Sequence, residues 1–155
     1  MKNELKTIKH LWTIVCERAS VDSLTNSVSL NSIYEEIQVK KKDSTGKASV
    51  PQKGEVIPFN HQIVSLWKRT DDGDEELVVD GQLEVVDPDG ELLGKFPHQI
   101  RVGKGKLRAR VIAQFNALKI TEPGEYVFKL SAKDPGTKGF VDISENYLTV
   151  KFVLN

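Results

Sequence analysis

The stretch Leu107-Arg108-Ala109-Arg110-Val111-Ile112-Ala113-Gln114-Phe115-Asn116-Ala117 decides the fold class of this 155-residue chain. Its odd positions are all apolar, and its even positions are polar except for Ile112. A period of two is typical of a β-strand that lays one face on a core and the other in water. The segment therefore predicts a half-buried strand.

The same alternation recurs along the chain. It is found in 126–132 and 148–154, and three shorter runs share a face at Trp12-Ile14-Cys16, Val28-Leu30 and Ile63-Ser65-Trp67. Turn residues separate these runs at the spacing expected of a sandwich. We predict one all-β domain over 1–155, an antiparallel sandwich of about eight or nine strands, in which only 30–39 could hide a helical turn.

The turn Asp87-Pro88-Asp89-Gly90 places Pro second and Gly fourth, as type I turns prefer. It predicts a hairpin that joins 83–86 to 92–93. Two segments look irregular instead. Residues 1–8 are polar and expected to fray, and 40–60, rich in Lys, Gly and Pro, reads as a loop longer than most compact domains carry, either functional or mobile.

Composition excludes several classes of protein. The 22 basic and 22 acidic side chains balance to zero, whereas a dedicated nucleic-acid binder normally carries surplus Lys and Arg. Cys16 is the only cysteine, so no disulfide can form within the chain. No apolar run approaches the length of a membrane span. We expect a cytoplasmic protein with neither a nucleic acid nor a membrane as its partner.

The segment 118–128, Leu-Lys-Ile-Thr-Glu-Pro-Gly-Glu-Tyr-Val-Phe, resembles the corner between the fifth and sixth strands of immunoglobulin-like sandwiches. In such domains a tyrosine, here Tyr126, bonds through its hydroxyl to the backbone upstream. Phe128 occupies the place of the second disulfide cysteine of antibody domains, so that bridge is missing. The resemblance implies an immunoglobulin-like fold.

Most of the chain is also similar to an uncharacterised bacterial family of about 150-residue β-sandwich proteins. The shared features are Cys16-Glu17-Arg18, Val21-Asp22, Asp87-Pro88-Asp89-Gly90 and Pro123-Gly124-Glu125-Tyr126. This second resemblance implies a fold but no activity, since sandwiches host many functions.

The spacing of the histidine, cysteine and acidic residues does not predict a catalytic site or a metal site. His10 and Cys16 would lie about 20 Å apart on one strand, so a buried, inert thiol is the better interpretation of Cys16. The acidic turn 71–76 lacks the spacing of a calcium loop and fits a solvated hairpin tip. We expect no enzyme activity, no metal and no cofactor.

Charge is distributed unevenly. The basic residues Lys104, Lys106, Arg108 and Arg110, with Arg101 before them, form a candidate anion-binding stripe, or an ordinary solvated face that protects a strand edge. The segment 71–91 holds ten carboxylates and no Lys or Arg. If the two regions lie apart, the molecule is bipolar and could self-associate head to tail. If they are neighbours, the charges pair across the sheet.

Two functions remain from these observations. The first is a non-catalytic protein-interaction or scaffold module, with the loop 40–60 or the segregated charge as its contact and a protein as its partner. The alternative is a small-ligand or anion-binding domain that uses the basic strand 101–110. An enzyme would have to assemble His61, His98, Asp87 and Asp134 from separate loops, which their spacing does not support.

Overall fold

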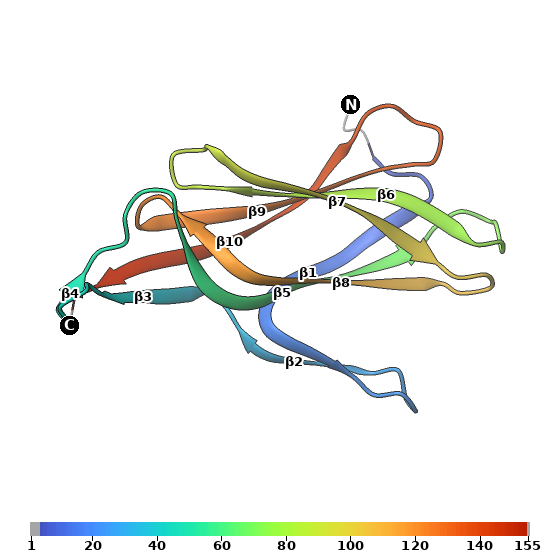
Figure 1. Ribbon diagram of the computed structural model, residues 1–155. Coiled ribbons are helices and arrows are strands. Elements are labelled where there is room, and N and C mark those ends of the chain that lie inside the picture. Colours follow the sequence, from blue (N-terminus) through green and yellow to red (C-terminus); the bar gives the residue numbers. More distant parts are fainter. Residues whose placement is uncertain (1–3, 155) are drawn as a thin grey trace.

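A computed structural model describes residues 4–154, which form ten strands and no helix (Figure 1). The strands are β1 (Ile8–Val21), β2 (Val28–Ile33), β3 (Glu36–Lys42), β4 (Ala48–Ser49), β5 (Glu55–Arg69), β6 (Leu77–Val86), β7 (Leu92–Val102), β8 (Arg108–Ile120), β9 (Gly124–Lys133) and β10 (Val141–Val153). The all-β class predicted from alternation is confirmed. In the described residues no helix is long and apolar enough to cross a membrane.

The strands form two curled sheets. One has the order β2-β1-β5-β8 and the other β4-β3-β10-β9-β6-β7. All pairs are antiparallel except β3 with β10. There are ten strands in the described chain rather than eight or nine, and the sheets curl as half-barrels, so the immunoglobulin-like arrangement is not confirmed.

The extra strands come partly from the segment 40–60, where the sequence predicted one long loop. That segment contains the end of β3, the short β4 and the beginning of β5. β4 pairs with β3 through Lys41↔Ser49 and Lys42↔Ala48. Gly46 lies in the first turn between these strands and Pro51 and Gly54 lie in the second, whereas Pro58 lies within β5, so the irregular backbone is much shorter than predicted.

The core lies between the sheets and follows the predicted alternation. Trp67 belongs to one buried cluster, together with Val79 and Ile100, and Tyr126 and Phe128 belong to the other. Inward residues of β9 and β10 are also buried, including Leu130, Ala132, Leu148 and Val150. Burying apolar surface of this kind is the main favourable term in folding.

Strand β2 and the end of β1 that pairs with it belong to the first sheet and curl over its outer face, below β5 and β8 in Figure 1. The backbone N–H of Ala19 donates to Oε1 of Gln62 on this face at 2.7 Å. Val64 points away from the core, since its neighbours Ile63 and Ser65 point in, yet it is 0% exposed. The hairpin therefore buries part of a sheet face that would otherwise meet water.

The chain leading into β1 is anchored rather than frayed within the described residues. The carboxylate of Asp134 accepts hydrogen bonds from the backbone N–H of Lys6 at 2.9 Å and of Thr7 at 3.0 Å. Ile8 is fully buried. The predicted fraying of residues 1–8 is thus wrong for 4–8, because a distant loop supplies the acceptor, and its first three residues lie outside the described range.

Candidate functional site

Strand β8 is the edge of the first sheet. It pairs with β5 over its whole length and with no other strand of the described chain. Across the gap lies β7, the edge of the second sheet, and no ladder of hydrogen bonds joins the two in residues 4–154. One side of β8 is therefore an unpaired strand edge.

The direction of the unpaired main-chain groups follows from one hydrogen bond. The carbonyl oxygen of Leu107 accepts from the N–H of Arg69 at 2.8 Å, so the backbone groups of Leu107 point toward β5. Main-chain directions alternate along a strand. The N–H and C=O groups of Arg110, Ile112 and Gln114 accordingly point to the free edge.

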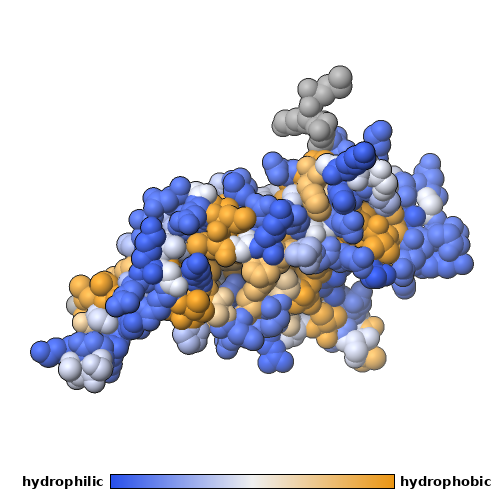
Figure 2. All heavy atoms as spheres, turned by 45° about the horizontal axis from the view of Figure 1, so that its top comes forward, coloured by the Kyte–Doolittle hydropathy of each residue, from blue (hydrophilic) through white to orange (hydrophobic). Residues whose placement is uncertain are grey.

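This edge lacks some of the devices by which proteins prevent strands from pairing with other chains. Proline in an edge strand is one such device, and β7 contains Pro97. The 13 residues of β8 contain no proline. Ile112 is 41% exposed on its outer face. Apolar side chains likewise reach the surface in separate patches among polar ones on the face drawn in Figure 2.

The four predicted anion-binding residues are placed in two different settings. Lys104 and Lys106 lie in the turn before β8, while Arg108 and Arg110 lie on the strand. Lys104 forms an ion pair with Glu75 at 3.3 Å. Arg110 donates through Nη2 to the carbonyl oxygen of Asn26 at 3.0 Å.

Lys106 and Arg108 remain available to a partner. No carboxylate of the described residues lies within ion-pair distance of either side chain, and both are exposed. Of the four residues, Lys106 and Arg108 are thus the two whose charged groups have neither an ion pair nor a hydrogen bond within the described residues, whereas the Arg110 guanidinium is held by a backbone carbonyl.

The acidic segment and the basic stripe are neighbours. The N–H of Gly105 in the basic turn donates to the carbonyl oxygen of Asp74 in the acidic turn at 2.8 Å. Besides Lys104, Arg101 pairs with Glu76 at 3.2 Å. Pairing between adjacent strands and turns, one of the two arrangements left open by the sequence, therefore accounts for this part of the charge segregation.

A buried cation organises the acidic turn 71–76. Arg69 is only 8% exposed, and its guanidinium donates to the Asp71 carboxylate and to the carbonyl oxygen of Glu75. The hydrogen bond from Arg69 lowers the pKa of Asp71. The buried Arg69 side chain thus fixes the acidic turn, and the Asp71 carboxylate already has a cationic partner.

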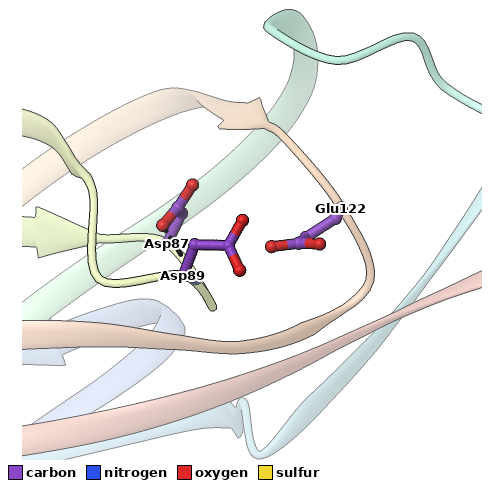
Figure 3. A group of neighbouring side chains, drawn as sticks. All are labelled: Asp87, Asp89 and Glu122. Atoms are coloured by element: carbon purple, nitrogen blue, oxygen red, sulfur yellow. Dashed lines mark hydrogen bonds between the residues drawn. The ribbon is translucent and has the colours of Figure 1, made fainter.

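A second group of carboxylates was not predicted. Asp87 and Asp89 lie in the turn after β6, and Glu122 lies in the turn after β8; in Figure 3 the carboxyl groups of Asp89 and Glu122 face each other, with Asp87 beside Asp89. One oxygen of each residue lies within 4.8 Å of the other two. The sequence concealed this group because folding brings together two turns more than 30 residues apart.

Asp87 has a structural role in this group. Its Oδ1 accepts from the N–H of Asp89 at 3.0 Å and of Glu91 at 2.8 Å, and its Oδ2 accepts from the Thr121 hydroxyl at 2.9 Å. Burial acts to raise the pKa of Asp87, but these donors outweigh it and the pKa is lowered. The side chain fixes the predicted hairpin turn, which is confirmed by the pairing of β6 with β7.

Glu122 differs from Asp87. A hydrogen bond with Asp89, together with burial and the nearby negative charges, raises the pKa of Glu122. Calcium sites need six to eight converging oxygens, and both oxygens of Asp87 already accept hydrogen bonds from the protein. The group is therefore explained as turn structure in which two carboxyl groups, those of Asp89 and Glu122, are neighbours.

The candidate nucleophile and bases are dispersed. Cys16 is buried as predicted, at 0% exposed, and burial raises the pKa of its thiol. His10 contacts the hydroxyl of Thr13, and His61 is stacked between Phe59 and Phe115. Within residues 4–154 no hydrogen bond joins Cys16 to a histidine.

Comparisons with known proteins give only distant likenesses. Neither a protein-family model nor a curated protein matches the sequence. A β-glucuronidase of Bacteroides uniformis is 20% identical over 65% of this chain, with a TM-score of 0.49. The alkylpurine DNA glycosylase AlkC of Pseudomonas fluorescens is 12% identical over 94% of the chain, with a TM-score of 0.43.

The C-terminal domain of wzt is also similar, with 19% identity over 70% of this chain and 68% of its own, and a TM-score of 0.35. The chain spans 12% of the length of the β-glucuronidase and 30% of the glycosylase. At these scores the likenesses assign neither a family nor a function.

Proposed function

We propose that this chain is a non-catalytic protein-interaction module that binds an extended segment of a partner along the free edge of β8. The observation that carries the proposal is the 13-residue edge strand whose outward main-chain groups have no partner within the described chain. An extended segment can add to such an edge as a further strand, with main-chain hydrogen bonds giving the affinity.

The charges beside the edge indicate the chemistry of the partner segment. Lys106 and Arg108 have no ion-pair partner among the described residues, so an acidic segment would complement them. Exposed charges are screened by salt, and binding should therefore weaken as ionic strength rises. The alternative function, binding of a small anion, would use the same two side chains but would not need the strand edge.

We also propose a fold family and a cellular location for this chain. We assign the chain to the immunoglobulin-like sandwiches and to the uncharacterised bacterial family of about 150 residues, acting in the cytoplasm. The hydroxyl of Tyr126 supports the first assignment, because it accepts from the N–H of Thr121 at 3.0 Å and donates to the carbonyl oxygen of Glu122 at 2.6 Å. The partner is a protein, with a second copy of the chain as one possible occupant of the edge.

Proline at position 112 tests strand addition. Ile112→Pro removes an N–H that points to the free edge and leaves the ladder to β5 intact, whereas Ile112→Thr keeps both the N–H and the branched side chain. The tagged chain and both variants are used to capture proteins from the native cells, and thermal melting checks their folding. We expect a stoichiometric partner with the wild type and Ile112→Thr, and its loss with Ile112→Pro.

Other results separate the alternatives. A partner that Ile112→Pro retains would contradict strand addition. Loss of binding in Arg108→Glu alone, with Ile112→Pro unaffected, would favour the anion-binding function.

A further inference from the structure

The gap between β7 and β8 is closed by aromatic packing. The rings of Phe96 and Phe115 meet edge to face, with centroids 4.9 Å apart. Phe96 is 40% exposed although it covers the core. The opposite gap, between β1 and β10, is held by a polar contact instead, in which Nδ2 of Asn146 donates to the carbonyl oxygen of Thr13 at 2.8 Å.

Two small cavities lie beneath this aromatic pair. One, of about 100 Å³, is lined by Val85, Leu93 and Phe128. The other, of about 120 Å³, is lined by Ile63, Leu83 and Leu130. Phe96 and Phe115 line both. Both cavities are partly open to solvent, and displacement of the Phe96 ring would join them and widen the opening.

Gly94 permits the closed position of the ring. A Cβ at this position would lie 2.8 Å from the edge of the Phe96 ring, closer than real side chains approach. The Phe96 ring therefore lies over the backbone of Gly94, in space that the side chain of any other residue at position 94 would fill. Its position depends on packing alone, because a phenylalanine has no polar group to fix it.

His98 adds a polar side chain to the lining of the larger cavity. Its Nε2 is buried over Gly81 and has no hydrogen-bond partner among the described residues, and its Nδ1 lies 3.5 Å from the carbonyl oxygen of Phe96. Burial lowers the pKa of His98, which favours the neutral ring. If Nδ1 carries the proton toward Phe96, Nε2 is a free acceptor. A buried polar atom without a partner costs free energy that a ligand can recover.

We propose that these cavities form a binding site for a compact, ring-shaped apolar molecule with one hydrogen-bond donor, which displaces Phe96 and donates to Nε2 of His98. An apolar cavity of about 150 Å³ is known to hold benzene, and the two cavities together offer about 220 Å³. Phenol and indole have the required size and donor. The site lies behind the free edge of β8, since Phe115 lines both cavities, but it uses side chains and not the outward main-chain groups of that strand.

Calorimetric titration of the full chain with phenol, and with benzene as the ligand that lacks a donor, tests the proposal. We expect saturable binding of phenol. His98→Leu should weaken phenol binding about tenfold, as loss of one hydrogen bond would, and change benzene binding by less than about threefold. Phe96→Ala should tighten the binding of both ligands, because no ring then needs to be displaced.

Three outcomes would overturn the proposal. The first is the absence of saturable binding of either ligand to the wild type and to Phe96→Ala, which would mean that the cavities hold only water or remain empty. The second is that His98→Leu weakens the binding of phenol and of benzene equally, which would show that phenol forms no hydrogen bond with His98. The third is unchanged phenol binding in Ala113→Phe, a variant that fills the larger cavity and whose folding is checked by its amide spectrum.

Discussion

Arg110 donates a hydrogen bond through Nη2 to the carbonyl oxygen of Asn26 at 3.0 Å. Asn26 lies in the turn of the β1–β2 hairpin, and Arg110 lies on the outer face of β8. The contact joins the two edge strands of one sheet across its outer face. A residue that sequence placed in an anion-binding stripe therefore has an internal role.

Replacement of this arginine should loosen the hairpin. Arg110→Ala removes the hydrogen bond and should lower the free energy of unfolding by about 1 kcal/mol, with faster amide exchange in residues 19–30. Urea unfolding and hydrogen exchange measure the two effects. Arg108→Ala serves as the control, since Arg108 has no ion-pair partner among the described residues, and equal effects of both variants would contradict the role of Arg110.

The hydroxyl of Tyr126 should contribute measurably to stability. It accepts from the N–H groups of Thr121 and Glu122 and donates to the carbonyl oxygen of Glu122. Tyr126→Phe leaves these backbone groups unpaired and should cost about 1–3 kcal/mol in urea unfolding. Among residues 4–154 the hydroxyl of the exposed Tyr147 hydrogen-bonds only to Glu145, so Tyr147→Phe should change stability by less than about 0.5 kcal/mol. Equal changes in the free energy of unfolding for Tyr126→Phe and Tyr147→Phe would contradict a structural role for the Tyr126 hydroxyl.

Sequence reasoning succeeded where the signal was local. Alternation located the inward residues of β9 because strand faces repeat every second residue, and the resemblance of residues 118–128 to an immunoglobulin-like corner implied the Tyr126 contact. The pairing of Lys104 with Glu75 was left open because it depends on which turns become neighbours. The Asp87–Asp89–Glu122 group and the hairpin over Val64 likewise arise from contacts distant in sequence.

Asp134 should stabilise the chain most strongly above its ordinary pKa. Burial acts to raise the pKa of Asp134, but the hydrogen bonds from Thr7 and Lys6 outweigh it and lower the pKa. A carboxyl with a lowered pKa contributes stability that is lost as the pH falls. Asp134→Asn should therefore lower the melting temperature at pH 7, and the difference from the wild type should shrink below about pH 4. A difference that stays constant between pH 7 and pH 3 would contradict this account.

The contribution of Glu122 to stability should depend on pH in the opposite direction from that of Asp134. Its hydrogen bond with Asp89 and the adjacent charges raise the pKa of Glu122, so ionisation of Glu122 opposes folding. The stability associated with its proton is present at low pH and is lost as the pH rises above about 4. We expect Glu122→Gln to raise the melting temperature at pH 7 and to have little effect at pH 4. As a control, Glu125→Gln, at an exposed position three residues on, should show no such pH dependence.

Amide hydrogen exchange of β8 tests the free strand edge most directly. In the isolated chain, the outward amides of Arg110, Ile112 and Gln114 should exchange rapidly, while those of Val111 and Ala113, which point to β5, should be protected. Once a captured partner is bound, the outward amides should become at least about tenfold slower. Outward amides that are already as protected as Val111 and Ala113 in the isolated chain, or that stay rapid in the complex, would contradict strand addition at β8.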